Sequence, residues 1–109
     1  MKEVKQKAHE LRYILSVTAY YKYIDTVKGN KYTTYEQANR KINRNIILAG
    51  PRIRKKDKNI ELNYGRLTIV IDSSTDFVVD IKNFSCMPEG WIKDMQNCNK
   101  LNKKFGIEV

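Results

Sequence analysis

Two short runs near the middle of the chain alternate apolar and polar residues, and they constrain the fold more than any other feature. The first is Arg66–Ile71 and the second is Phe77–Lys82. Alternation with a period of two places successive side chains on opposite faces of a β-strand, so each run predicts a strand with one buried face. Because residues 73–76 are all turn-forming types, we expect the two strands to form an antiparallel hairpin.

Matching the apolar residues of the two strands predicts the register of this hairpin. The buried face would contain three pairs: Ile71 with Phe77, Ile69 with Val79, and Leu67 with Ile81. The opposite face would contain three others: Val70 with Val78, Thr68 with Asp80, and Arg66 with Lys82. Cationic, hydroxyl and carboxylate groups are therefore expected together on the side of the sheet turned away from the core.

The N-terminal region has the pattern of an amphipathic helix over residues 2–15. Its apolar residues recur three or four positions apart: Val4, Ala8, Leu11 and Leu15. Residues 17–27 are rich in β-branched and aromatic types, and they fit either a continuation of this helix or a strand that begins near Leu15. We favour continuation of the helix.

A second helix is marked at both ends. Residues 33–36, Thr-Thr-Tyr-Glu, have the form of a capping box, and Gly50 with Pro51 is a stop signal. The buried stripe between them is expected to contain Ala38, Ile42, Ile46 and, at its margin, Leu48. The outer face is expected to contain Arg40, Lys41 and Arg44.

The remaining segments complete the predicted fold. Residues 60–64 alternate as a strand does, and a last helix is expected from about Glu89. Its apolar stripe would be Trp91, Met95, Cys98, Leu101 and Phe105, with Lys93, Lys100, Lys103 and Lys104 facing water. We therefore predict a single α+β domain over residues 1–109, with two N-terminal helices, a three- to four-stranded antiparallel meander and a C-terminal helix.

The charge balance indicates an anionic partner. The chain has 21 Lys and Arg against 12 Asp and Glu, a formal net charge of +9. Lys and Arg contacts to phosphate supply most non-specific affinity for nucleic acid, although an acidic protein would also be attracted to this positive charge. No apolar run approaches the roughly 20 residues of a membrane helix, so we expect no membrane partner. The N-terminus lacks the pattern of a signal peptide, which favours a cytoplasmic site of action; delivery as a domain of a secreted protein stays open.

Several kinds of chemistry have no support in the sequence. There is no phosphate-binding glycine loop, no nucleophile elbow and no zinc-protease motif. With Cys86, Cys98 and His9 as the only cysteines and histidine, a metal site is not expected, and no cofactor motif is present. We favour free thiols over a disulfide for the two cysteines.

The polar face of the predicted sheet is the best candidate for a catalytic site. Metal-free cleavage of RNA needs a base, an acid and cations that stabilise the charged phosphorane. Glu61 or His9 could act as base or acid, Arg66 and Lys82 could hold the phosphate, and Thr68 could donate a hydrogen bond. The alternative is a solvated sheet face without catalytic use.

A basic segment precedes the meander and is the predicted binding site for the nucleic-acid backbone. It contains Arg52, Arg54, Lys55, Lys56 and Lys58, and the nearby Tyr64 could stack on an unpaired base. The alternatives are a solvated hairpin tip and a tyrosine that covers the core.

Residues 35–81 resemble the barnase–EndoU–colicin–RelE group of ribonuclease toxins. The similar stretches are IILAGPRIR, IELNYGRLTIVID and FVVDI. The resemblance implies helices before an antiparallel meander, RNA bound on the open sheet face, metal-free cleavage of tRNA or mRNA, and an acidic immunity or antitoxin protein as partner. It assigns functional positions to Arg66, Thr68 and the pair Arg52 and Arg54.

The chain also departs from that group. No histidine lies in the meander, and the last 25 residues have no counterpart in the group. The first hypothesis is a small basic ribonuclease toxin. The alternative is a non-catalytic basic regulator, of the phage or plasmid type, that binds nucleic acid or an acidic host protein.

Overall fold

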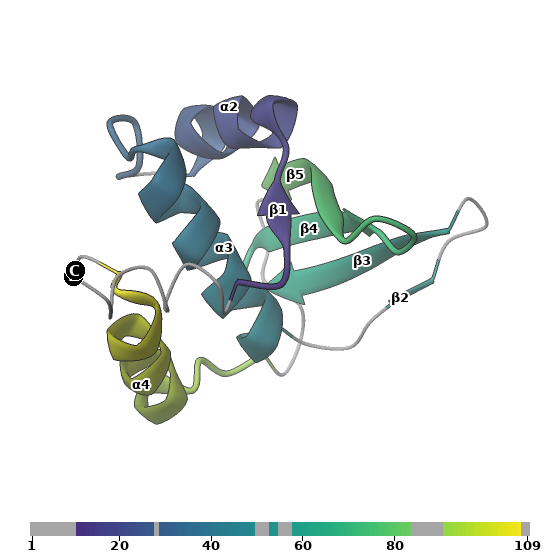
Figure 1. Ribbon diagram of the computed structural model, residues 1–109. Helices are drawn as coiled ribbons and strands as arrows, with labels where there is room; N and C mark the ends of the chain where they lie inside the picture. The colour runs from purple at the N-terminus through teal and green to yellow at the C-terminus, as the bar shows by residue number, and fades with distance from the viewer. Residues whose placement is uncertain (1–10, 28, 50–52, 55–57, 84–90, 108–109) are drawn as a thin grey trace.

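The computed structural model describes residues 11–27, 29–49, 53–54, 58–83 and 91–107, the residues 53–54 by their backbone alone. Three helices are present in this part of the chain: α2 (Val17–Thr26), α3 (Tyr35–Leu48) and α4 (Met95–Phe105). The strands are β1 (Ile14–Leu15), β2 (Ile53–Arg54), β3 (Asn59–Tyr64), β4 (Leu67–Asp72) and β5 (Phe77–Asn83). Figure 1 shows α3 against the sheet and α4 beyond α3.

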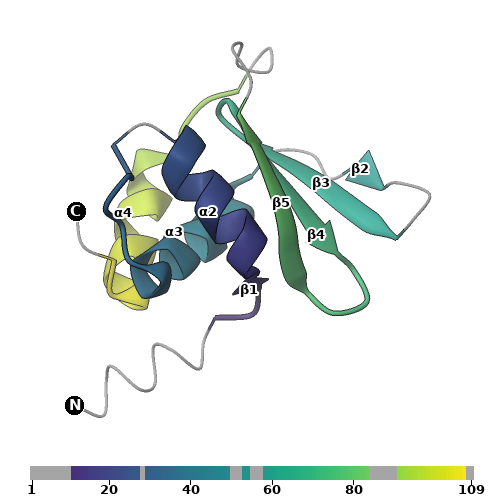
Figure 2. The same ribbon diagram turned by 90° about the horizontal axis from the view of Figure 1, so that it is seen from above.

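The sheet has five strands in the order β1-β5-β4-β3-β2. Strands β2 to β5 form an antiparallel meander, which confirms the α+β class and the predicted meander. The prediction omitted β1, which pairs in parallel with β5 and makes the sheet mixed. Helix α2 lies beside β5 (Figure 2), where Asn83 Nδ2 donates to the Thr26 carbonyl at 2.8 Å.

The predicted register of the β4–β5 hairpin is wrong. Thr68 pairs with Lys82 rather than with Asp80, and Ile69 pairs with Ile81. Near the turn Ile71 pairs with Val78, because an irregularity between Val70 and Ile71 adds one residue to β5. A bulge of this kind reverses the faces of the residues beyond it. Val78 is therefore fully buried, whereas Phe77, expected in the core, is 40% exposed.

The β3–β4 hairpin turns through two residues, Gly65 and Arg66, between the paired Tyr64 and Leu67. Gly65 has φ +60°, as the first position of a type II′ turn requires. A β-carbon at Gly65 would meet only the Trp91 ring, at 3.8 Å, an ordinary contact. The requirement for glycine is therefore conformational rather than steric.

Gly65→Ala is expected to lower the free energy of unfolding by about 1–2 kcal/mol, because alanine is strained at positive φ. Urea unfolding followed by the fluorescence of Trp91, the only tryptophan in the chain, would measure the loss. Arg66→Ala in the same turn is the matched control and should change stability by less than about 0.5 kcal/mol. Equal effects of the two substitutions would contradict this account of the turn.

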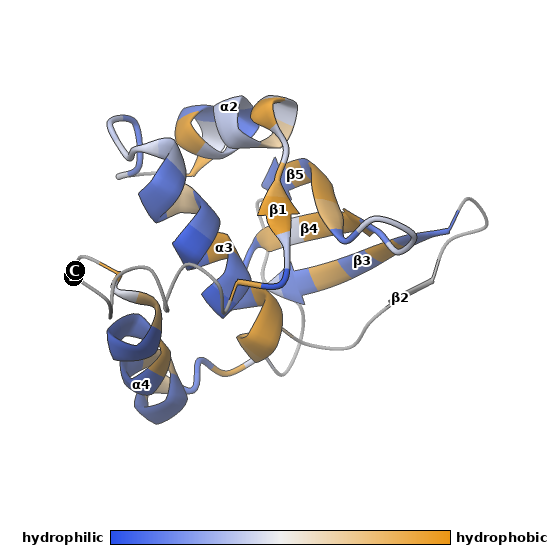
Figure 3. Ribbon diagram, in the orientation of Figure 1, coloured by the Kyte–Doolittle hydropathy of each residue, from blue (hydrophilic) through white to orange (hydrophobic). Residues whose placement is uncertain are grey.

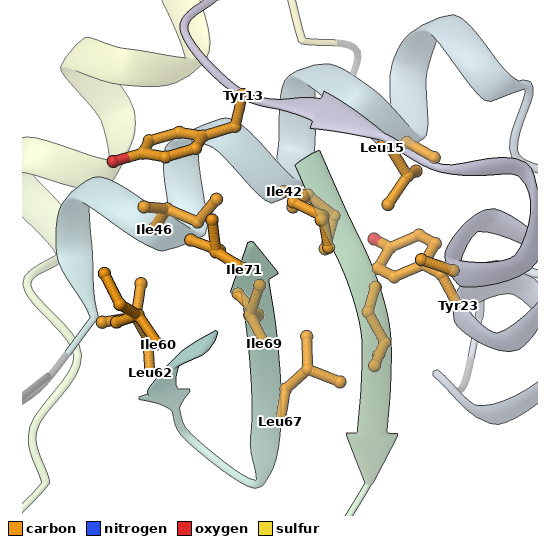
Figure 4. Close-up of a cluster of buried hydrophobic side chains, with 14 residues drawn as sticks. Tyr13, Leu15, Tyr23, Ile42, Ile46, Ile60, Leu62, Leu67, Ile69 and Ile71 are labelled. Carbon is orange, nitrogen blue, oxygen red and sulfur yellow. The ribbon is translucent and has the colours of Figure 1, made fainter. Parts of the chain in front are cut away.

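The core lies between α3 and one face of the sheet. Ala38, Ile42 and Ile46 of α3 are buried, as predicted, and Leu48 is half-buried at the margin. The sheet supplies Ile60, Leu62, Leu67, Ile69, Ile71, Val78 and Ile81. Figure 4 shows Ile42 and Ile46 of α3 and Leu15 of β1 beside the side chains of β3 and β4, and Figure 3 shows hydrophobic residues on the strands, on α2 and at the end of α3.

Residues 11–15 are not helical, contrary to the prediction. The backbone of this segment is held by amide side chains of α3. Tyr13 N donates to Asn43 Oδ1 at 2.9 Å, and Asn43 Nδ2 donates to Tyr13 O at 2.9 Å. Leu15 N donates to Asn39 Oδ1 at 3.0 Å. These side-chain bonds take the place of the backbone bonds of a helix. Helix α2 is a separate helix that begins at Val17, and its N-cap Ser16 accepts a hydrogen bond from Ala19 N.

The helix ends agree with the prediction in part. The cap of α3 is Thr34, whose hydroxyl accepts from Gln37 N at 3.2 Å, while Glu36 pairs with Arg40 instead of reaching back. The helix ends at Leu48; Gly50 and Pro51 lie outside the described residues. The last helix begins at Met95, with Asp94 as its cap, rather than near Glu89.

Candidate nucleic-acid interface

The predicted polar sheet face exists in part. Asn63, Thr68 and Lys82 lie side by side across three strands, and Glu61, Val70 and Asp80 form the next such row. Because paired residues point to the same side of a sheet, these groups share the face opposite the core. The prediction that Glu61, Thr68 and Lys82 share a face is therefore confirmed.

The centre of this face is closed. Thr68 is only 2% exposed and Val70 only 5%. The Thr68 hydroxyl donates to Asn63 Oδ1 at 2.8 Å, so its proton is already used. In this arrangement Thr68 is placed for a structural hydrogen bond and not for contact with a bound phosphate.

Asp80, one of the two carboxylates on this face, is held by neighbouring groups. Burial raises the pKa of Asp80, but hydrogen bonds from Lys22 and from the Ile81 N–H outweigh burial, and the net pKa is lowered. Lys22 of α2 approaches Asp80 Oδ1 at 2.7 Å. An ionised carboxylate held by a lysine is a poor proton donor at neutral pH.

The predicted cations of the sheet are dispersed. Arg66 lies exposed in the β3–β4 turn rather than opposite Lys82, which is exposed near the end of β5. Lys58 is exposed with φ +69° at the start of β3, and Arg54 lies in β2. His9, Arg52, Lys55 and Lys56 lie outside the described residues, so their predicted roles stay predictions.

Tyr64 packs inward. Its ring meets the Trp91 ring edge-on at 5.2 Å between centroids. The Tyr64 hydroxyl is buried, and its pKa is raised by burial and by the neighbouring Cys98 thiol. This residue covers the core near α4, which is the alternative that the sequence left open.

Metal chemistry and membrane insertion find no support in the described part of the chain. It holds no group of three or more His, Cys, Asp or Glu residues placed to bind a metal ion. None of its helices combines the length and the apolar character that crossing a membrane demands. Cys98 is a buried free thiol, and Cys86 lies outside the described residues.

The densest group of exposed cations among the described residues lies on α4. Five exposed residues form what we call the α4 outer face: Gln96, Asn99, Lys100, Lys103 and Lys104. Their spacing of three and four residues places them on one side of a helix, opposite the buried Cys98 and Phe105. Lys93, also exposed, precedes the helix. The prediction that these lysines face water is confirmed, but their grouping as a site was missed.

The charge of the α4 outer face is not neutralised within the described structure. Helix α4 contains no acidic residue, and none of its lysines forms an ion pair with a described carboxylate. Asp72 and Asp76 lie at the β4–β5 turn, on the other side of the molecule from α4 (Figures 1 and 2). The sequence did contain a signal for this site, because residues 95–105 include no Asp or Glu that could neutralise the lysines.

Helix α4 is fastened to α3 by charged hydrogen bonds. Arg44 Nη1 donates to Asn102 Oδ1 at 2.8 Å, and Arg40 Nη1 donates to the Gly106 carbonyl at 3.1 Å. Arg40 was expected on an outer face, but α4 covers it and leaves it 7% exposed. Gly106, with φ +68°, caps the helix, so its end is well defined. The outer face therefore stands on a fixed support.

Comparison with known proteins places the chain in a family. The YorE family model matches residues 13–104. The chain belongs to the YorE family. The YorE match includes every described strand, α2, α3 and nearly all of α4. No curated protein and no solved structure matches the chain. The YorE assignment names no activity, so the function has to be argued from the geometry of the protein.

Proposed function

We propose that this YorE-family protein binds nucleic acid through the α4 outer face and does not cleave it. The observation that supports the proposal is the group Lys100, Lys103 and Lys104 on one exposed side of a helix without a carboxylate. Lysine ammonium groups bind phosphate as compact point charges. A helix of 11 residues spans about 16 Å, enough to place three lysines along several successive phosphates.

The sheet face gives less support to ribonuclease chemistry. General acid–base cleavage needs a proton donor and acceptor that reach the substrate. Thr68 is buried and Asp80 is ion-paired, while Glu61 lies in the same row as Asp80 and Val70. Cleavage through His9 remains a separate prediction, because His9 lies outside the described residues.

The proposal predicts steep salt dependence of binding. Neutralising about four phosphates gives a slope of about −3.6 for log affinity against log salt on duplex DNA, so affinity should fall about 150-fold between about 50 and about 200 mM salt. Fluorescence anisotropy with a labelled duplex measures this directly. A slope near zero, or no binding at low salt, would overturn the proposal.

The same samples test cleavage. Labelled RNA incubated with the protein should remain intact on a denaturing gel, both with and without a metal chelator. Degradation that persists with chelator, and that Glu61→Gln or His9→Ala abolishes, would restore the ribonuclease hypothesis. An acidic protein partner would compete with nucleic acid for the same lysines, and it would have to be found by its own binding assay.

A further inference from the structure

We infer that the α4 outer face enters the major groove of duplex DNA and that Gln96 and Asn99 contact base edges there. The inference rests on the proposed nucleic-acid binding and adds the substrate class and the origin of sequence preference. Amides of Asn and Gln can bond adenine through two hydrogen bonds in the major groove, where the pattern of donors and acceptors differs for every base pair.

The four amide side chains of α4 divide into two kinds. Asn97 Nδ2 donates to the capping Asp94 at 2.7 Å, and Asn102 accepts from Arg44 at 2.8 Å. The amides of Asn97 and Asn102 are therefore engaged in hydrogen bonds within the protein. Gln96 and Asn99 are exposed and form no hydrogen bond with a described residue. Asn is disfavoured inside helices, so the presence of Asn99 on a solvent face has no structural benefit.

The free amides lie among the lysines. Gln96, Asn99 and Lys103 follow each other at intervals of three and four residues, and Lys100 and Lys104 flank them on the same side. A helix with side chains is about 10–12 Å across, and the major groove of B-DNA is about 12 Å wide. In such a docking the amides can meet the bases while the lysines meet the phosphates on either side.

The packing of α4 against the rest of the protein is suited to contacts with DNA bases. Helix α4 lies against α3, its Cys98 and Phe105 are only 3% exposed, and its far side stays uncovered by any described element (Figure 1). Arg40 and Arg44 fix its C-terminal half. Base contacts require side chains held in position, which a helix on a rigid support provides better than a loop.

Duplex DNA fits this face better than RNA. The major groove of A-form RNA is deep and narrow, so a helix cannot read it. Single-stranded RNA is usually bound by aromatic rings that stack on bases, and the α4 outer face has none. The observed chemistry of lysine and amide groups is that of major-groove contacts.

The test is selection from a library of duplex DNA with a randomised central segment, using the full-length protein. The wild-type protein should enrich a defined motif. The double variant Gln96→Ala with Asn99→Ala should bind a scrambled duplex within about twofold of wild type, because the lysines remain. Its preference for the enriched motif should fall by at least about tenfold. Thr18→Ala, an exposed position on α2, is the control and should retain the preference.

The outcomes separate the two proposals. No binding to any nucleic acid would overturn the proposed function. Binding without an enriched motif, an unchanged preference in the double variant, or equal affinity for double-stranded RNA would overturn the inference and leave the proposed function standing. Circular dichroism of the double variant should match wild type, since alanine favours a helix at both positions.

Discussion

Replacing Asn43 with alanine is expected to lower the free energy of unfolding by about 3 kcal/mol. Asn43 is 2% exposed and bonds both the N–H and the carbonyl of Tyr13, at 2.9 Å each. Removing the amide leaves two buried backbone groups without their partner, and each unmade bond of this kind costs about 1–3 kcal/mol. The buried residue Tyr13 and strand β1 depend on this contact for their position.

The measurement is urea unfolding followed by circular dichroism and by Trp91 fluorescence. Asn99→Ala is the matched control, since it removes the same group from an exposed helical position, and it should raise stability by a few tenths of a kcal/mol. A loss below about 1 kcal/mol for Asn43→Ala would show that water or another group replaces the amide, against this account of the N-terminal segment.

The second large effect concerns binding. The triple variant Lys100→Gln, Lys103→Gln, Lys104→Gln is expected to weaken binding to duplex DNA by at least about 100-fold at about 50 mM salt. Three fewer neutralised phosphates also lower the magnitude of the salt slope by about 2.7. Glutamine is close to lysine in helix propensity, so the fold should be unchanged, which the unfolding curve would verify.

Local patterns were sufficient to predict the central elements. Alternation in residues 66–71 and 77–82 predicted β4 and β5 to within one residue at each end, and the spacing of Ala38, Ile42 and Ile46 predicted α3. These patterns succeed because each element buries one face against the same core, so the period of its apolar residues reports its geometry directly.

Features set by distant contacts could not be predicted in this way. The β5 bulge adds one residue opposite β4, and the apolar residues on both sides of it read equally well in a regular strand. The sequence of residues 11–15 is compatible with the end of a helix. Their structure is decided by Asn43 and Asn39, far along the chain, which accept hydrogen bonds from their backbone. In both places a tertiary contact decides the structure, and no local pattern encodes it.

The proposed site differs from the predicted one for the same reason: tertiary contacts decide which side chains are exposed. The sheet face was chosen because strand pairing brings its polar residues together, but its centre at Thr68 is buried. Arg40 and the lysines of α4 were all read as solvated side chains. Only the packing of α4 on α3 separates the buried Arg40 from the exposed Lys100, Lys103 and Lys104.

The most direct test compares two triple variants that remove the same charge from different surfaces. One is the α4 variant above, and the other is Lys58→Gln, Arg66→Gln, Lys82→Gln on the sheet. Both variants lower the net charge by three. If binding depended on net charge alone, the two variants would therefore lose affinity for duplex DNA to the same extent. By anisotropy at low salt, we expect the α4 variant to bind duplex DNA at least about tenfold more weakly than the sheet variant. Equal affinities, or a greater loss in the sheet variant, would contradict the assignment of binding to α4.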